Sequence, residues 1–243
     1  MTIKHAMVLA AGLGTRMRPI TNTIPKPLVR IAGKPMIDYA LDSLAEAGVE
    51  KVVVNVHHFA NQMQAHLSAY EGLDIIISDE RDQLMNNGGG LAKGLKLLER
   101  GDVFVANADL FWIGERTDRP SNLRRLAGFF NSTQMDMAML CVRLEDTTGH
   151  NGKNDFNLAS DGRLTRYREG EPNPIVYAGA IVINTSFFDD APADAFNLNI
   201  YFDKAIARGR LFGMMLEGHW LTVGTPGAIV EAEETIRRFR TFA

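Results

Sequence analysis

The sequence predicts an α/β fold, a three-layer α/β/α sandwich in which helices cover both faces of a mostly parallel, mixed sheet. Two observations predict it. In the first half of the chain, short apolar runs of strand length alternate with longer amphipathic segments, and the connections between them are short. The apolar runs are nearly continuous, which is typical of strands that are buried on both faces.

The elements of the first half follow in order. Residues 4–10 form a short buried strand, and a glycine-rich turn follows it. A helix over residues 35–47 opens at Pro35 and stops at Gly48, with its apolar residues on one stripe. Further strands are expected at 52–56, 73–78 and 102–107, and further helices at 59–68 and, after a turn at 87–90, at 90–98. This alternation predicts a Rossmann-like arrangement.

The second half of the chain is richer in strands. Strand-like segments are expected at 135–144, 154–159, 163–168 and 175–184, and helices at 197–208 and 226–240. A separate second domain is the alternative, but no Pro/Gly/Ser-rich linker or charge block marks a boundary. We therefore expect a single domain over residues 1–243, with an inserted or edge region near 145–175.

Composition excludes several classes of protein. The net charge of −3 and the isoelectric point of about 6.1 argue against a nucleic-acid-binding surface built on bulk positive charge. No apolar run approaches the roughly 18 residues of a membrane span, and a first strand near residue 4 leaves no room for a signal peptide. The single Cys141 cannot form an internal disulfide. We expect a cytoplasmic protein without nucleic-acid or membrane partners.

The loop after the first strand has the chemistry of a phosphate site. It reads Ala10-Ala11-Gly12-Leu13-Gly14-Thr15-Arg16-Met17-Arg18-Pro19. Glycines permit positive φ and let backbone N–H groups approach a phosphate closely. The loop is neither a GxGxxG dinucleotide motif nor a Walker loop. Two guanidiniums, with the ammonium of Lys26 in Pro25-Lys26-Pro27-Leu28, form a set of cations suited to a triphosphate.

The string LAAGLGTRMRPIT…PKPL closely resembles the signature of the sugar nucleotidyltransferases, the NDP-sugar pyrophosphorylases. The resemblance extends over nearly the whole chain. It includes Asn87-Gly88-Gly89-Gly90, Asn107-Ala108-Asp109, Tyr177-Ala178-Gly179 and His219-Trp220-Leu221-Thr222-Val223-Gly224-Thr225-Pro226. The resemblance implies an enzyme that joins a sugar 1-phosphate to a nucleoside triphosphate and releases pyrophosphate.

The resemblance also implies roles for particular residues. Arg16 would hold the β- and γ-phosphates, Lys26 the sugar phosphate and α-phosphate, and Asp109 a Mg²⁺ ion. From the residues alone, an aspartate after a buried strand could equally be a helix N-cap, and a triple glycine could be purely structural. The implied nucleotide contacts are Leu9, Ala10, Ala11, Gly12, Gly14, Thr15, Asn87 and Gly88. The implied sugar contacts are Asn154, Glu169 and Gly179.

Two positions depart from the family pattern. Thr222 stands where the family usually has an aspartate, the second metal ligand. Glu169-Gly170-Glu171-Pro172 lacks the phosphate-contacting lysine of the family's Glu-Lys-Pro segment. The first departure puts metal affinity in question, and the second puts the sugar-phosphate contacts in question.

The choice of substrate rests on the same resemblance. The segment His150–Phe156, the small size and the lack of a C-terminal β-helix resemble N-acetylmuramate 1-phosphate uridylyltransferases, which serve peptidoglycan recycling. Mannose-1-phosphate guanylyltransferases are the alternative. Because of Thr222, a catalytically weak sensor of nucleotide sugars is a third hypothesis. We expect a monomer or a homodimer.

Overall fold

The computed structural model describes residues 2–242, which form α-helices, strands and several short 3-10 turns. The α-helices are α1 (Met36–Glu46), α2 (Ala60–Ser68), α3 (Asn86–Leu95), α4 (Asn122–Phe129), α5 (Asn199–Ala207) and α6 (Pro226–Phe242). The strands of the main sheet are β1 (His5–Leu9), β4 (Lys51–Val56), β5 (Asp74–Asp79), β6 (Asp102–Asn107), β8 (Met137–Val142), β10 (Phe156–Leu158), β11 (Leu164–Arg166), β12 (Pro174–Asn184) and β13 (Leu211–Met215). Two smaller sheets contain β7 (Leu110–Ile113), β14 (His219–Thr222) and β9 (Thr147–Thr148), and β2 (Arg30–Ile31) with β3 (Lys34–Pro35).

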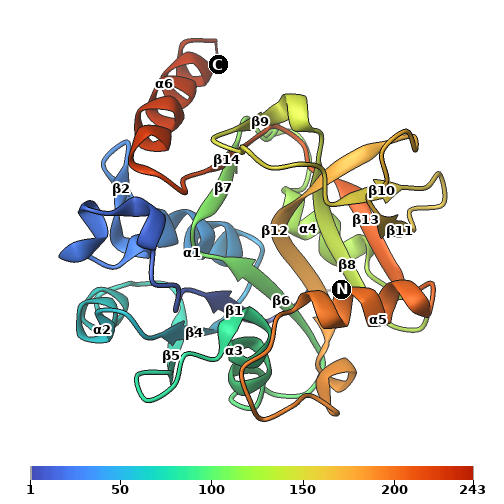
Figure 1. Cartoon of the computed structure of the whole chain (residues 1–243), viewed down its shortest axis with the longest axis horizontal. Coiled ribbons are helices and arrows are strands. Elements are labelled where there is room, and N and C mark those ends of the chain that lie inside the picture. The colour runs from blue at the N-terminus through green and yellow to red at the C-terminus, as the bar shows by residue number, and fades with distance from the viewer. Residues whose placement is uncertain (1, 243) are drawn as a thin grey trace.

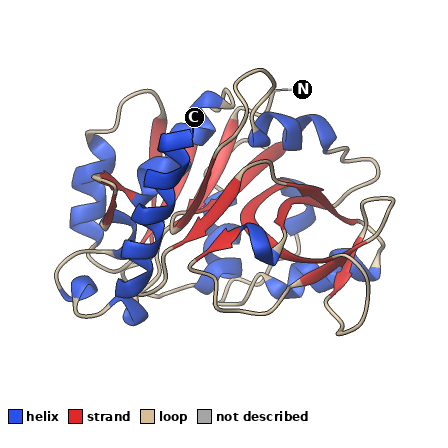
Figure 2. Ribbon diagram, turned by 90° about the horizontal axis from the view of Figure 1, so that it is seen from above, coloured by secondary structure: helices blue, strands red, loops and turns tan. Residues whose placement is uncertain are grey.

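The main sheet is mixed, and its N-terminal part is parallel. The order β5-β4-β1-β6 is parallel throughout, with Val8 of β1 opposite Val54 of β4. The long strand β12 then runs antiparallel to β6 and to β8, and β13 adds parallel to β8. Figure 2 shows these strands in the middle of the molecule with helices on either side. The predicted α/β/α sandwich with a mixed sheet is confirmed.

Alternate residues of each strand face opposite layers of helices. In β1, Val8 belongs to an apolar cluster with residues of α1, α2 and α4, whereas Met7 packs with residues of α3 and α5. Both side chains are completely buried. Full burial of a side chain of this size stabilises the fold by about 1.5–3 kcal/mol. The strict alternation therefore fixes which face of the sheet each helix covers.

A third apolar cluster lies beside the main sheet. Helix α6 contributes Ala232 and Ile236 to it, β14 contributes Leu221, and the N-terminal segment contributes Met17 and Ile31. Figure 1 shows α6 at the edge of the molecule, away from β10 and β11. This cluster joins the end of the chain to the loop that follows β1. Within residues 2–242, no helix combines the length and the apolar character needed to span a membrane.

Most of the elements expected from the sequence are present within a few residues of the expected bounds. The strands expected at 4–10, 52–56, 73–78, 102–107, 135–144, 154–159, 163–168 and 175–184 correspond to β1, β4, β5, β6, β8, β10, β11 and β12. The helices expected at 35–47, 59–68, 197–208 and 226–240 correspond to α1, α2, α5 and α6. The segment near 145–175 contains β9, β10 and β11. Its sugar-binding role and the single-domain assignment stay predictions.

The start of α3 corrects one expectation. The triple glycine was expected in a turn before the helix, but α3 begins at Asn86 and contains all three glycines. Close packing explains them, because a Cβ at Gly88 would lie 2.4 Å from the ring of Phe196. A Cβ at Gly90 would lie 2.6 Å from Nδ2 of Asn55. Each glycine lowers the helix propensity of α3 by about 1 kcal/mol relative to alanine. The absence of a Cβ allows the helix backbone to lie close to Phe196 and Asn55.

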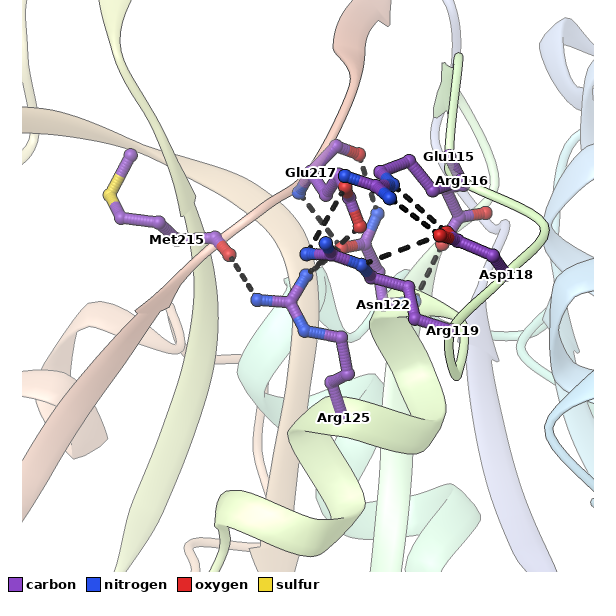
Figure 3. Close-up of polar contacts among 8 residues, drawn as sticks. All are labelled: Glu115, Arg116, Asp118, Arg119, Asn122, Arg125, Met215 and Glu217. Carbon is purple, nitrogen blue, oxygen red and sulfur yellow. Dashed lines mark hydrogen bonds and ion pairs between the residues drawn. The ribbon is translucent and has the colours of Figure 1, made fainter.

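Asn122, at the start of α4, joins two distant segments (Figure 3). Its Nδ2 donates to the carbonyl of Glu217 at 2.9 Å, and the Glu217 N–H donates back to Asn122 Oδ1 at 2.9 Å. The Asn122 N–H donates to Oε1 of Glu115 at 2.6 Å. Asn122 is only 1% exposed. It therefore holds the turn that precedes β14 against the start of α4.

Asn122→Ala should lower the free energy of unfolding by about 2–4 kcal/mol, because the N–H and carbonyl of Glu217 lose their buried partner. Urea denaturation followed by circular dichroism measures the change. Arg116→Ala is the matched control in the same cluster, because the Arg116–Asp118 ion pair is exposed and should leave the midpoint nearly unchanged. Equal midpoints for both variants would contradict the role of Asn122.

Candidate functional site

A cleft of about 300 Å³ opens at the carboxyl ends of β1, β4 and β6. Its lining residues come from the glycine-rich loop after β1 (residues 10–19, here the glycine loop), the Lys26 segment, the ends of these strands and the start of α3. They are Leu9, Ala10, Ala11, Gly12, Lys26, Pro27, Asn55, Leu84, Asn86, Asn87, Asn107, Ala108 and Asp109. Open α/β sheets bind ligands at this end of their strands. The fold thus gathers five segments that are distant in sequence around one cavity.

Lys26 and Asp109 meet in this cleft as an ion pair. Lys26 opens a 3-10 turn and is only 9% exposed, and the Asp109 side chain is 36% exposed. Asp109 lies two residues after the end of β6, and the N–H of the intervening Ala108 donates to the carbonyl of Leu9 at 3.1 Å, which ties the ends of β6 and β1 together. The strand β7 begins at the next residue, so the helix N-cap alternative for Asp109 is wrong. The pair brings a cation and a carboxylate to one point of the cleft.

The glycine loop leaves β1 and turns sharply at Gly14. Its φ of 62° is left-handed, and the carbonyl of Gly14 accepts a hydrogen bond from Thr21 Oγ1 at 2.8 Å. A Cβ at Gly14 would lie 3.0 Å from Cβ of Lys26, so the loop packs directly on the lysine segment. Thr15 and Arg16 continue as a 3-10 turn. The structure therefore brings Gly12 to the cleft lining, whereas Gly14 and Thr15 are not among the lining residues.

Arg16 lies near the segment that follows β14. A Cβ at Gly224 would lie 3.6 Å from the guanidinium nitrogens of Arg16. Arg16 is exposed, and in residues 2–242 its guanidinium has no carboxylate partner. It is not among the residues that line the cleft. The side chain is thus an unpaired cation on the same loop as the lining residues.

At the start of α3 the structure separates two of the expected nucleotide contacts, Asn87 and Gly88. Asn87 lines the cleft, and its Oδ1 accepts a hydrogen bond from the Leu198 N–H at 2.9 Å. Gly88 is buried behind it, and its N–H donates to the carbonyl of Phe196 at 3.0 Å. The N–H of Gly88 is therefore already bonded within the protein, whereas Asn87 and its neighbour Asn86 face the cavity.

The residues expected to contact the sugar are dispersed. Gly179 has a φ of 78° where β12 changes register against β8, and a Cβ there would lie 2.4 Å from the side chain of Leu110. Gly179 therefore packs next to the residue that follows Asp109. Asn154 is half-buried, and its Oδ1 has no hydrogen-bond partner in the described chain. Glu169 is exposed between β11 and β12, and none of these three residues lines the cleft.

Tyr177 supplies a second buried polar atom without a partner. Its hydroxyl, like Oδ1 of Asn154, forms no hydrogen bond within residues 2–242. Burial, followed by the nearby negative charge of Asp155, raises the pKa of Tyr177 well above its usual range, so the hydroxyl keeps its proton at neutral pH. The backbone N–H of Tyr177 donates to Oδ2 of Asp155 at 2.9 Å. Buried polar atoms without a partner are uncommon, and a catalytic role, a water or an ion can account for them.

The segment expected to complete a metal site lies beside Asp109. In the pairing of β14 with β7, Thr222 lies opposite Leu110, and the Val223 N–H points to the carbonyl of Asp109 at 3.4 Å. The Trp220 indole donates to the carbonyl of Ala178 at 2.9 Å and ties β14 to β12. Among the described residues, no group of three or more histidine, cysteine, aspartate or glutamate side chains could hold a metal ion. The neighbourhood offers one cleft-lining carboxylate.

Six of the lining residues were not among the candidates expected from the sequence. They are Pro27, Asn55, Leu84, Asn86, Asn107 and Ala108. Asn55 had a visible signal, since it is a polar residue inside the apolar run Val52-Val53-Val54-Asn55-Val56. Asn107 and Ala108 directly precede Asp109. The remaining three, Pro27, Leu84 and Asn86, line the cleft only because of how the loops and α3 pack.

A comparison with protein families identifies the class of enzyme. The family model described as nucleotidyl transferase matches residues 5–238, and the chain belongs to this family. It is therefore a nucleotidyltransferase, a conclusion that agrees with the sandwich fold and with a cleft at the strand ends.

Individual members of the family differ in how similar they are to this chain. The chain is 43% identical over 238 residues to an N-acetylmuramate alpha-1-phosphate uridylyltransferase of Caulobacter vibrioides, covering 95% of this chain and 96% of the relative. It is 31% identical to the enzyme of the same name from Neisseria meningitidis, covering 94% and 96%. A mannose-1-phosphate guanyltransferase of Yarrowia lipolytica is 30% identical, covering 90% of this chain but only 60% of the relative. Among solved structures, UDP-glucose pyrophosphorylase complexed with UDP-glucose has a TM-score of 0.78 at 20% identity, covering 97% and 99%. That last likeness shows a shared fold.

Proposed function

We propose that the chain condenses N-acetylmuramate 1-phosphate with UTP to give the UDP-sugar and pyrophosphate, in the recycling of peptidoglycan sugars. The observation that carries the proposal is the Lys26–Asp109 pair in a cleft at the strand ends. The relatives support the choice of substrate, because this chain spans nearly all of the two uridylyltransferases but only 60% of the guanyltransferase. The cytoplasmic location and a monomer or homodimer remain part of the proposal.

The reaction needs positioning and charge neutralisation rather than a covalent intermediate. An oxygen of the sugar phosphate attacks the α-phosphorus in line, and the bond from that phosphorus to the oxygen of the β-phosphate breaks as pyrophosphate leaves. Lys26 holds the sugar phosphate and the α-phosphate, where negative charge is densest in the transition state. Arg16, which has no carboxylate partner in the described chain, holds the β- and γ-phosphates.

The donor set near Asp109 fits a Mg²⁺ ion that is shared with the substrate. Mg²⁺ usually keeps several waters and takes one or two carboxylates, with phosphate oxygens completing its shell. Asp109 supplies one carboxylate on the cleft. Bound there, the ion would neutralise charge on the α-phosphate oxygens. The chain therefore fits a Mg²⁺ cofactor held by Asp109 and the phosphates, with Thr222 as a neutral neighbour.

A pyrophosphate-release assay tests the proposal directly. The sugar phosphates are N-acetylmuramate 1-phosphate, mannose 1-phosphate and glucose 1-phosphate, each with UTP, GTP, CTP and dTTP. We expect the highest kcat/KM with N-acetylmuramate 1-phosphate and UTP. A preference for mannose 1-phosphate with GTP would replace that substrate pair by the guanylyltransferase reaction. Nucleotide binding without pyrophosphate release would favour the sensor function that Thr222 suggests.

Thr222→Asp should lower the half-saturating Mg²⁺ concentration several-fold. A carboxylate next to the cation adds an attraction of about 4 kcal/mol at ~4 Å and an effective dielectric near 20, before desolvation. The expectation is supported by the pairing of Thr222 with Leu110, the residue that follows Asp109. The measurement is a Mg²⁺ titration of turnover at saturating nucleotide. Thr222→Asn is the matched neutral control, and superimposed curves for all three proteins would place Thr222 away from the metal.

A further inference from the structure

A buried chain of three hydrogen bonds joins the two walls of the cleft. The Ala10 N–H, in the glycine loop, donates to Asn55 Oδ1 at 2.6 Å. Asn55 Nδ2 donates to Glu80 Oε1 at 2.7 Å, and the Met85 N–H donates to Glu80 Oε2 at 3.0 Å. Asn55 is 2% exposed and Glu80 is 1% exposed. These three hydrogen bonds therefore connect the loop after β1 to Met85, the residue just before α3.

The order of donors and acceptors in this chain is fixed at both ends. A backbone N–H can only donate, so the Asn55 amide must turn its oxygen to Ala10 and its NH₂ group to Glu80. Met85 likewise presents only a donor, so both oxygens of Glu80 accept. At this side-chain length a carboxylate offers two acceptor oxygens and a glutamine only one. The side chains at positions 55 and 80 must therefore match each other.

The packing of α3 leaves this pair no freedom to move. A Cβ at Gly90 would lie 2.6 Å from both Asn55 Nδ2 and Glu80 Oε1, so the helix backbone passes directly over the hydrogen bond. On the other side, Asn55 is held by the parallel pairing of β4 with β1 and β5. Asn55 lines the cleft itself, while Glu80 lies behind the lining. The spacing between the glycine loop and the start of α3 is thus set by buried side chains.

We propose that Asn55 and Glu80 are positioning residues for the nucleotide, holding the Leu9–Gly12 wall and the Leu84–Asn87 wall at the separation that fits a nucleoside triphosphate. The inference rests on the proposed function, which places the nucleotide in this cleft. Glu80 need not contact the nucleotide for this role. Glu80 acts by fixing Asn55 and the Met85 backbone.

The test reverses the middle hydrogen bond. Glu80→Gln keeps an acceptor for Met85 but points an NH₂ group at the NH₂ of Asn55. Asn55→Asp keeps an acceptor for Ala10 but points a carboxylate at Glu80. The double variant Asn55→Asp/Glu80→Gln restores all three bonds, with position 80 now donating to position 55. Buried mismatches of this kind cost enough to change binding about 10- to 100-fold.

The readouts are the Kd of UTP by calorimetry, then KM for each substrate and kcat. We expect each single variant to raise the Kd of UTP about 10- to 100-fold and the double variant to return to about threefold of wild type. KM for the sugar 1-phosphate and kcat at saturating UTP should change much less. Ser78→Ala is the matched control, because Ser78 is equally buried on β5 and its hydroxyl has no partner within residues 2–242. It should leave the Kd of UTP unchanged.

The outcomes separate the possible failures. If the wild type binds none of UTP, GTP, CTP and dTTP, the proposed function and this inference both fall. If the wild type binds UTP and the folded single variants bind it equally well, only the positioning role falls, even where their Tm is lower. A double variant that folds but binds as weakly as the singles also overturns the role. Where a single variant does not fold, the UTP affinity of the double variant decides alone.

Discussion

Lys26→Ala should lower kcat for pyrophosphate release by about 100-fold or more, because in the proposed mechanism the ammonium acts on charge that develops in the transition state. The fold should survive the change. Lys26 lies at the wall of an open cleft, and its partner Asp109 is exposed enough to be hydrated when the ammonium is gone. The measurement is steady-state kinetics with both substrates saturating, together with thermal denaturation.

Two further variants sharpen the result. Lys26→Met keeps the aliphatic stem and removes only the charge, so it should lose as much activity as Lys26→Ala. Lys34→Ala removes a lysine whose ion pair with Asp42 is more exposed and lies outside the cleft lining, so it should leave kcat unchanged. Activity of both Lys26 variants within about threefold of wild type, far below the loss expected of a transition-state contact, would remove Lys26 from the mechanism.

Asp109→Asn should reduce Mg²⁺-dependent turnover by about 1000-fold, a loss of about 4 kcal/mol in transition-state stabilisation. The structure adds a stability effect. The Lys26 side chain is only 11% exposed, and within residues 2–242 its carboxylate partner is Asp109. Without that partner the ammonium is left in a place where water reaches it poorly. We expect a loss of about 1–3 kcal/mol in the free energy of unfolding without metal.

A double-mutant cycle distinguishes the catalytic and structural roles of Asp109. Lys26→Met in the Asp109→Asn background removes the unpaired charge, so it should recover stability but no activity. Asp118→Asn, at an exposed ion pair away from the cleft, is the control and should change neither quantity. If Asp109→Asn kept Mg²⁺-dependent turnover within about tenfold of wild type, or 1.4 kcal/mol, Asp109 would not be the metal ligand.

The sequence predicted the central sheet well because its strands carry their own signal. The runs that became β1, β4, β5 and β6 are apolar segments that alternate with helices along the chain, a pattern typical of parallel strands buried on both faces. The start of α3 was wrong for a local reason. Three consecutive glycines indicate a turn by conformational preference, and only the tertiary contacts with Phe196 and Asn55 show why a helix uses them.

Other elements carry too little local signal to be found. β7 and β14 are four residues each, and they are strands because they pair with each other across a sequence separation of about a hundred residues. α4 has only eight residues, and its buried Asn122 forms its hydrogen bond with Glu217, which is distant in sequence. Such pairings arise from the whole fold, so a window of sequence does not contain them.

The sequence predicted individual residues of the candidate site but not the contacts between them. Lys26 and Asp109 were each singled out from motifs, whereas the ion pair between them spans 83 positions of the sequence. Asn55 and Glu80 were not candidates, because their importance lies in mutual hydrogen bonds rather than in any motif. The sequence thus identifies side chains with suitable chemistry, and the fold determines which of them act together.

The Lys26–Asp109 pair also has a thermodynamic consequence on the proposed function. A phosphate that engages Lys26 frees the carboxylate of Asp109, and a cation that engages Asp109 frees the ammonium of Lys26. Linkage then requires that each ligand raise the affinity for the other by the same factor. Free cation and free nucleotide should each bind weakly, while the two together bind well. On the proposed function, the pair would therefore make the enzyme select the nucleotide–metal complex as a unit.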